Sequence, residues 1–152
     1  MGKSKKLIIR QMEERDLETV YTISKATLLD IWTFEDYQRE LLENQFATML
    51  VLTYDDVVIG FIDFWVTFNS ATIAQIAIHE SLHHKGLGSI LLGDMLNRLK
   101  TLNDVEVVTL EVRTHNKAAI NFYKKHGFEI TVTKKKYYKN GDDAYYMLRN
   151  IK

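Results

Sequence analysis

The chain has 152 residues, 46% of them hydrophobic and 26% charged, so it can bury a core and does not have the composition of a disordered protein. Its 20 basic and 20 acidic residues cancel, and a chain without net charge lacks the overall positive field that attracts nucleic acid. The absence of cysteine excludes disulfides, thiolate zinc sites and a cysteine nucleophile. No stretch is long enough to span a membrane, so we expect a cytoplasmic protein with neither a membrane nor a nucleic acid as its direct partner.

The first part of the chain predicts one strand followed by two helices. Leu7–Gln11 is a short β-rich run, and Asp16 is placed to cap a first helix. Thr33 and Asp36 have the spacing of a capping box, which predicts the start of a second helix. No repeat, linker or proline interrupts the pattern, so we expect residues 1–152 to form a single domain.

Three β-rich runs follow and predict an antiparallel meander. They are Met49–Tyr54, Val57–Phe68 and Thr72–Ile78. The short polar connections at Asp55-Asp56 and Asn69-Ser70 are typical of hairpin turns.

The second half alternates helices and strands. A polar loop, 79–89, precedes a helix whose leucines recur at the spacing of a buried face. The remaining predicted elements are a strand over Val105–Val112, a helix over Ala118–His126 between Asn116 and Gly127, and strands over Phe128–Val132 and Ala144–Leu148. The order β-α-α-β-β-β-α-β-α-β-β predicts a mixed α/β (α+β) fold, with a mostly antiparallel central sheet flanked by helices.

The run His83–Ser89 is the most informative local feature. Gly86 and Gly88 let the backbone turn tightly with its N–H groups exposed, and the positive end of the following helix dipole adds to their field. Such a loop suits a pyrophosphate, although a helix that merely begins with glycines explains the loop alone equally well. A Walker loop is excluded because no Gly-Lys-Ser/Thr is present, and Leu91 occupies the place of the third Rossmann glycine.

Four motifs in order resemble the GNAT acetyltransferases, and among them the ribosomal-protein-alanine N-acetyltransferases. The motifs are His83-His84-Lys85-Gly86-Leu87-Gly88, Leu110-Glu111-Val112-Arg113, Asn116 to Tyr123 followed by Gly127-Phe128, and Tyr137-Tyr138 followed by Gly141-Asp142-Asp143-Ala144 and Met147. With Ile31-Trp32-Thr33, which resembles a P-W-S segment, the likeness covers essentially the whole chain. The chain departs from the family pattern at His83, where Gln or Arg is usual, at Ile31, where proline is usual, and at Asp142, where Glu is usual.

The resemblance implies a GNAT fold with acetyl-CoA as co-substrate and no metal. It implies that the pantetheine lies along the backbone of Ile76, Ala77 and Ile78, with the Ile78 N–H donating to the thioester oxygen. The pyrophosphate would be held by His84, Lys85, Gly86, Leu87, Gly88 and Ser89. The Asn116 side chain would touch the cofactor.

The resemblance also implies two catalytic side chains. Glu111 would be the general base, and Tyr123 the general acid that donates a proton to the leaving thiolate. Without the resemblance, Glu111 is better explained as a solvated strand carboxylate, and Tyr123 as a helix aromatic packed with Phe122 and Phe128.

Three aromatic residues are candidates for binding the acceptor. Trp32, Tyr137 and Tyr138 lie in segments that flank the acceptor cleft of the resembling family, although core or edge packing explains them equally well. The five histidines show no metal-ligand spacing, and the basic run 134–136 is explained as a solvated face.

The sequence therefore predicts transfer of an acetyl group from acetyl-CoA to a primary amine, by direct attack in a ternary complex. The partner we expect is a protein N-terminus, such as that of a ribosomal protein. One alternative acceptor is a small amine, namely a polyamine, amino acid or antibiotic. A second alternative is a domain that binds acetyl-CoA without turnover, against which the presence of both Glu111 and Tyr123 argues.

Overall fold

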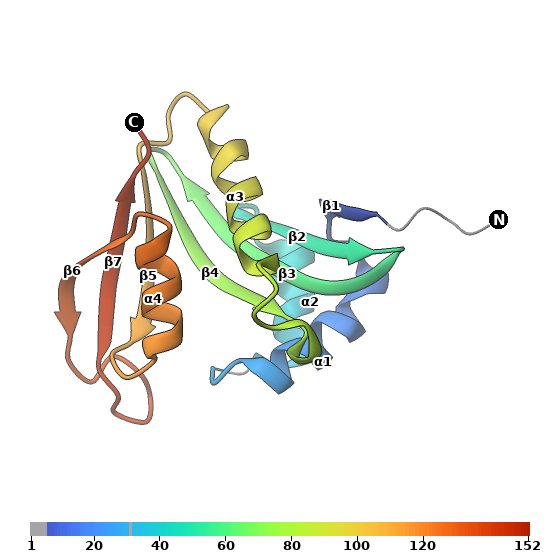
Figure 1. Cartoon of the computed structure of the whole chain (residues 1–152), viewed down its shortest axis with the longest axis horizontal. Coiled ribbons are helices and arrows are strands. Elements are labelled where there is room, and N and C mark those ends of the chain that lie inside the picture. Colours follow the sequence, from blue (N-terminus) through green and yellow to red (C-terminus); the bar gives the residue numbers. More distant parts are fainter. Residues whose placement is uncertain (1–5, 31) are drawn as a thin grey trace.

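A computed structural model of the chain describes residues 6–30 and 32–152. In these ranges the strands form a seven-stranded sheet in the order β1-β2-β3-β4-β5-β7-β6, and among the described strands only β4 and β5 pair in parallel (Figure 1). The elements are β1 (Leu7–Gln11), a 3₁₀ turn (Glu14–Asp16), α1 (Leu17–Thr27), α2 (Phe34–Glu43), β2 (Ala47–Tyr54), β3 (Val57–Thr67), β4 (Ser70–Ile78), a second 3₁₀ turn (Glu80–Leu82), α3 (Leu87–Lys100), β5 (Val107–Arg113), α4 (Lys117–Lys125), β6 (Glu129–Lys134) and β7 (Ala144–Asn150). The predicted fold class, a mostly antiparallel mixed sheet flanked by helices, is confirmed.

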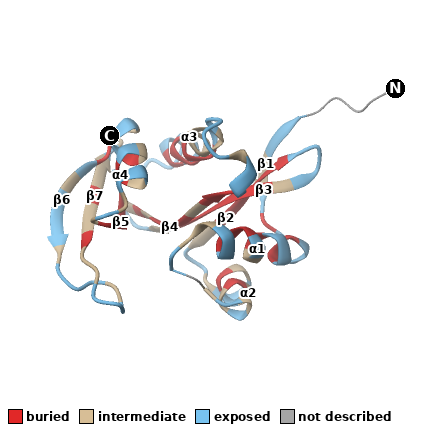
Figure 2. Ribbon diagram, turned by 60° about the horizontal axis from the view of Figure 1, so that its bottom comes forward, coloured by how far each residue is buried: buried red, intermediate tan, exposed pale blue. Residues whose placement is uncertain are grey.

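The helices cover the sheet unevenly. The helices α1 and α2 pack beneath the β2–β4 part, whereas α3 and α4 lie on the opposite side (Figure 2). The apolar stripe predicted for the third helix, α3, is confirmed, because Leu91, Leu92 and Met95 are fully buried on its side of the sheet. In the part of the chain that the structure describes, no helix covers the lower face of β5, β7 and β6 (Figure 2).

Alternation along β5 divides its side chains between these two environments. Val108, Leu110 and Val112 are at most 6% exposed and pack in the core with α4, as the sequence predicts. Because successive strand residues point to opposite faces, Thr109, Glu111 and Arg113 lie on the other face. We call these three residues the acceptor face.

The strands β4 and β5 separate after a short contact. They pair only over Ser70–Thr72 and Val107–Thr109, and then diverge toward their carboxyl ends (Figure 1). A bulge in the β3–β4 ladder, between Asp63 and Phe64, lies close to the point where β4 leaves β5. The rest of β4, from residue 73 to 78, is therefore not paired with β5.

Two predicted helix starts need correction. Asp16 does not cap α1, because its carboxylate accepts from the Glu13 N–H at 2.8 Å and from the Arg10 guanidinium at 2.7 and 2.9 Å. Both Asp16 carboxylate oxygens accept from Arg10 on β1 and so do not cap the N–H groups of α1. The helix α3 starts at Leu87, so Gly88 and Ser89 belong to its first turn rather than to the preceding loop. No helix in the described ranges is both long and apolar enough to cross a membrane.

Candidate active site

Residues 83–89, which we call the phosphate loop, join β4 to α3 with their backbone groups exposed. Gly86 adopts a left-handed conformation with φ of +79°, which glycine tolerates best, and it is the N-cap of α3. The first N–H groups of a helix have no partner within it, so those of Leu87, Gly88 and Ser89 are available to an anion. His84 and Lys85 are exposed beside them. The loop therefore has the geometry expected for a pyrophosphate cradle.

The first turn of α3 is held against α4. A Cβ on Gly88 would lie 3.3 Å from the Phe122 ring, so a larger residue here would require the ring to shift by a few tenths of an ångström. The Ser89 hydroxyl lies 2.8 Å from Nε2 of His126, at the end of α4. These contacts fix the distance between the phosphate loop and α4.

The end of β4 depends on a glycine that the sequence analysis missed. A Cβ on Gly60, in β3, would lie 2.9 Å from the carbonyl oxygen of Ala77, which is closer than real side chains come. Its only sequence signal is a glycine inside a strand, which often marks a close backbone approach. His83 also supports this strand, because its Nε2 lies 2.7 Å from the carbonyl oxygen of Ile78. The residue that departs from the family pattern therefore ties the phosphate loop to β4.

Two of the predicted site residues lie on α4. Asn116 caps the helix by accepting a hydrogen bond from the Ala119 N–H at 3.2 Å, which confirms the predicted N-cap. Tyr123 is 8% exposed, and its ring makes edge contacts with Phe122 and Phe128. Burial raises the pKa of Tyr123, so its hydroxyl is protonated at neutral pH. Its packing matches the structural explanation, while its protonation suits a general acid.

Each residue of the acceptor face has a polar partner. The hydroxyls of Thr109 and Thr72 are 3.1 Å apart where β4 and β5 last pair. Glu111, with 22% of its side chain exposed, accepts from the Lys134 ammonium at 2.9 Å through Oε1. This hydrogen bond raises the pKa of Lys134. Glu111 is therefore a paired carboxylate, rather than the freely solvated one of the simpler explanation.

Arg113 joins two segments that are far apart in the sequence. Its Nη2 donates to Asp30 at 2.8 Å, and its Nε lies 3.4 Å from an Asp142 oxygen. The guanidinium carbon lies 3.8 Å from the centre of the Tyr138 ring, a cation–π contact. Asp30 precedes α2, whereas Tyr138 and Asp142 belong to the link between β6 and β7. Arg113 ends the motif Leu110-Glu111-Val112-Arg113, but the sequence alone indicated no role for its side chain.

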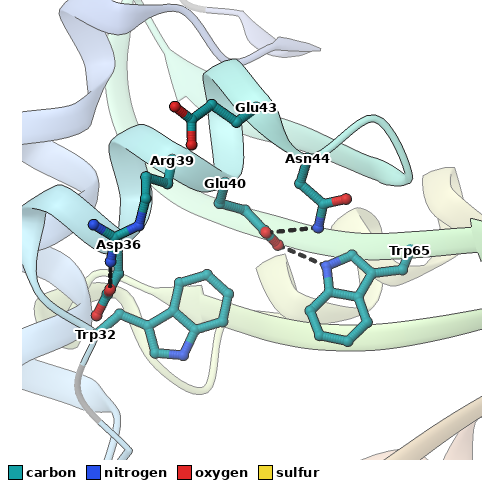
Figure 3. Close-up of a pocket in the computed structure, with 7 residues that line it drawn as sticks. All are labelled: Trp32, Asp36, Arg39, Glu40, Glu43, Asn44 and Trp65. Carbon is teal, nitrogen blue, oxygen red and sulfur yellow. Dashed lines mark hydrogen bonds and ion pairs between the residues drawn. The ribbon is translucent and has the colours of Figure 1, made fainter.

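The three predicted acceptor aromatics do not form one group. The rings of Tyr137 and Tyr138 are in edge contact at 5.0 Å, close to Arg113. The Trp32 ring instead packs against Tyr37 and faces a hollow of about 530 Å³ beside α2 (Figure 3). The hollow is lined by Trp32, Asp36, Arg39, Glu40, Glu43, Asn44 and Trp65.

A buried carboxyl group neighbours Glu40, one of the residues that line this hollow. Asp63 is 0% exposed, and neither of its carboxyl oxygens has a hydrogen-bond partner among the described residues. Burial and the neighbouring Glu40 raise the pKa of Asp63 to about 10, so it is neutral at pH 7. Glu40 accepts from the Trp65 indole N–H at 2.6 Å and from the Asn44 amide at 2.8 Å (Figure 3). The pair combines one neutral and one hydrogen-bonded carboxyl group.

Comparison with known proteins adds to this geometry. The Acetyltransferase (GNAT) family matches residues 11–128. A Bacillus subtilis protein, provisionally named a ribosomal protein bS18-alanine N-acetyltransferase, is 34% identical over 143 residues, which are 93% of this chain and 94% of that protein. An N-alpha-acetyltransferase of Sulfurisphaera tokodaii is 29% identical over 157 residues, covering 95% of this chain and 93% of its own. The crystal structure of the ribosomal-protein-S18-alanine N-acetyltransferase from Escherichia coli superposes with a TM-score of 0.86 at 27% identity, covering 96% of this chain and 94% of that one.

Proposed function

This chain belongs to the GNAT family of acetyltransferases, and from that premise we propose that it acetylates the N-terminal α-amine of a protein. It is an N-acetyltransferase that uses acetyl-CoA as acetyl donor. The observation that carries the proposal is the divergence of β4 and β5 beyond Thr72 and Thr109, which leaves an edge of β4 unpaired with β5 and leaves Glu111, with 22% of its side chain exposed, on the acceptor face. The names of the two relatives that match over most of the chain support a protein N-terminus as the acceptor.

Binding of the donor uses mainly backbone groups. The N–H groups at the start of α3, with Lys85 and His84 beside them, hold the pyrophosphate. The unpaired edge of β4 at Ile76, Ala77 and Ile78 holds the pantetheine, and Asn116 contacts it from α4. Acetyl-CoA supplies an acetyl group already activated as a thioester.

Transfer divides between the two sides of β5. The amine nitrogen attacks the acetyl carbonyl carbon, while Oε2 of Glu111, which has no partner in the described ranges, takes the proton from the nitrogen directly or through water. The Ile78 N–H stabilises the negative charge that develops on the carbonyl oxygen. The carbon–sulfur bond then breaks, and Tyr123 gives its proton to the leaving sulfur.

The chemistry favours an α-amine over a lysine. An α-amino group has a pKa of about 7.7–8.0, so roughly a tenth or more is neutral at pH 7, whereas a lysine amine near 10.4 is almost wholly protonated. A single carboxylate such as Glu111 can deprotonate the first far more readily than the second.

One observation favours a small cationic amine as the second candidate acceptor. The hollow beside α2 brings the carboxylate of Glu40 together with the indole rings of Trp32 and Trp65, and Glu43 also lines it (Figure 3). Carboxylates and aromatic faces both attract ammonium groups. A polyamine would suit these walls.

An acceptor panel with labelled acetyl-CoA separates the candidates. It contains peptides with free or blocked N-termini, spermidine, free amino acids and aminoglycosides. We expect turnover of free-N-terminus peptides that is lost on blocking and reduced by Tyr138→Ala. A small amine acetylated with far higher kcat/KM than every peptide would establish the second candidate instead.

A further inference from the structure

We infer that Arg113 selects peptide acceptors by donating a hydrogen bond from Nη1 to a backbone carbonyl oxygen next to the reacting amine. The inference deepens the proposed function and rests on its peptide acceptor. It assigns to Arg113 a binding role that a simple amine, which has no carbonyl group, cannot use.

The first observation is a donor without a partner. The Arg113 side chain is 9% exposed, and its Nη1 is buried with no hydrogen-bond partner among the described residues. Its other groups are engaged, with Nη2 bonded to Asp30 and Nε beside Asp142. Because buried donors are nearly always paired, and an unpaired one destabilises the fold, a missing partner is expected here. Asp30, which bonds Nη2, is 54% exposed, so the guanidinium lies just below the surface, while Nη1 itself is covered in the chain without an acceptor.

The second observation is the place of Arg113 relative to the proposed base. Arg113 and Glu111 lie two residues apart on the same face of β5, a separation of about 7 Å along the strand. In a peptide, the first carbonyl oxygen is three bonds from the α-amine nitrogen, and the next residue adds at most about 3.6 Å. If the α-amine lies at Glu111 and the peptide runs along β5 toward Arg113, one of its first carbonyl oxygens therefore lies within reach of the guanidinium.

The third observation is that the guanidinium is fixed from both sides. Asp30 holds it from the segment before α2, while Asp142 and the Tyr138 ring hold it from the link between β6 and β7. A guanidinium so oriented presents its remaining N–H in one direction, which a flexible lysine ammonium does not reproduce.

The test compares two acceptors in Arg113→Lys. One acceptor is a peptide that begins with a free alanine, and the other is isopropylamine, which has the same branched α-carbon and no carbonyl group; both rates are referred to the concentration of neutral amine, because an alkylamine is almost wholly protonated at pH 7. We expect kcat/KM for the peptide to fall roughly tenfold to a hundredfold, mainly through KM, as for loss of a charged hydrogen bond. The rate with isopropylamine and the Kd for acetyl-CoA should stay at the wild-type values.

Two further variants make the result specific. Asp30→Asn removes one support of the guanidinium and should give a smaller loss with the same preference for the peptide, which also decides the matter if Arg113→Lys does not fold. Arg149→Lys is the matched control, because Arg149 also donates to a backbone carbonyl, that of His126 at 2.6 Å, on another part of the sheet. It should change neither acceptor's KM.

The outcomes distinguish this inference from the proposed function. Equal losses with both acceptors would mean that Arg113 only ties the two segments together, and an unchanged peptide KM would remove any contact with the acceptor. Either result overturns the inference while wild-type turnover of the peptide stands. A wild-type chain that acetylates no peptide overturns both.

Discussion

The two sides of the diverging strands bind by different means. On the donor side, the phosphate loop and the end of β4 offer backbone N–H and C=O groups, arranged by Gly60, Gly86 and Gly88. On the acceptor side, we propose that recognition falls to side chains such as Glu111 and Arg113, each of which is held by an ion pair. A backbone site needs space and particular φ angles rather than particular side chains. A side-chain site needs each partner in place.

This difference predicts that the departure at His83 does not weaken acetyl-CoA binding. The side chain at that position ties the loop to the Ile78 carbonyl, and it leaves the N–H groups of the helix start free. No equivalent freedom exists around Arg113, where the charge of one residue is balanced by carboxylates from two other segments.

The largest effect should come from adding bulk and charge to the phosphate loop. Gly86→Glu should abolish acetyl-CoA binding, because it forces a side chain into a left-handed residue and puts a carboxylate where the pyrophosphate lies. In the wild-type chain, acetyl-CoA should raise the melting temperature by mass action, and calorimetry should give its Kd.

Gly141→Glu is the matched control for this prediction. Gly141 also has a positive φ, +92°, and nothing lies within 4 Å of an added Cβ, but it belongs to the acceptor-side link. It should bind acetyl-CoA with wild-type affinity. If both variants lose binding alike, backbone strain rather than the loop's anion site is responsible.

The next effect is on the rate of transfer, and it should leave donor binding intact. Glu111→Gln and Tyr123→Phe should each lower kcat roughly a hundredfold to ten-thousandfold, as expected for loss of a general base or acid. Both substitutions conserve shape, so the Kd for acetyl-CoA should change little. Single-turnover rates at saturating substrate give the comparison, and wild-type rates with chemistry limiting would reject the two roles.

The buried Asp63 should make the stability of the folded chain depend on pH. Its pKa, about 10 in the folded chain, is about 3.9 when unfolded, so between these values the folded state binds the extra proton. Its contribution to stability is therefore complete below about pH 4 and declines as the pH rises toward 10, with a slope of up to about 1.4 kcal/mol per pH unit. Asp63→Asn keeps the shape without the titration, and should flatten this decline.

Urea unfolding between pH 6 and 9 tests the prediction. The wild-type free energy of unfolding should fall with rising pH more steeply than that of Asp63→Asn. Parallel curves for the two proteins would show that Asp63 is ionised in the folded chain. The Kd for acetyl-CoA should follow neither curve, because Asp63 lies on the face of the sheet that α2 covers.

Features that depend on neighbouring residues could be predicted from the sequence, whereas contacts between distant residues could not. The capping box at Thr33 and Asp36, the alternation along β5 and the glycine loop are local patterns, and the structure confirms them as structural elements. The roles predicted for Glu111 and Tyr123 came from the family resemblance and stay predictions.

What failed or was missed depends on distant partners. Asp16 was assigned as a cap from its neighbours in sequence, but Arg10 on β1 takes its carboxylate. Asp30 and Arg113 are 83 positions apart, so no local pattern indicates that they meet. The burial of Asp63 likewise follows from the packing of α2 on β3.

The smallest effect compares one helix cap from each side. Thr33 caps α2 by accepting from the Asp36 N–H at 3.0 Å, and Asn116 caps α4 by accepting from the Ala119 N–H at 3.2 Å. Replacing either by alanine should lower the free energy of unfolding by about 1 kcal/mol, which is a fall of about 2–4 °C in melting temperature for a chain of this size. Because the two losses are alike, stability alone does not separate the caps.

The Kd for acetyl-CoA separates the two caps, since only the Asn116 amide is proposed to touch the donor. This Kd should rise in Asn116→Ala and stay unchanged in Thr33→Ala. Equal affinities in both variants would reduce Asn116 to a helix cap and leave donor binding to the backbone of β4 and the phosphate loop.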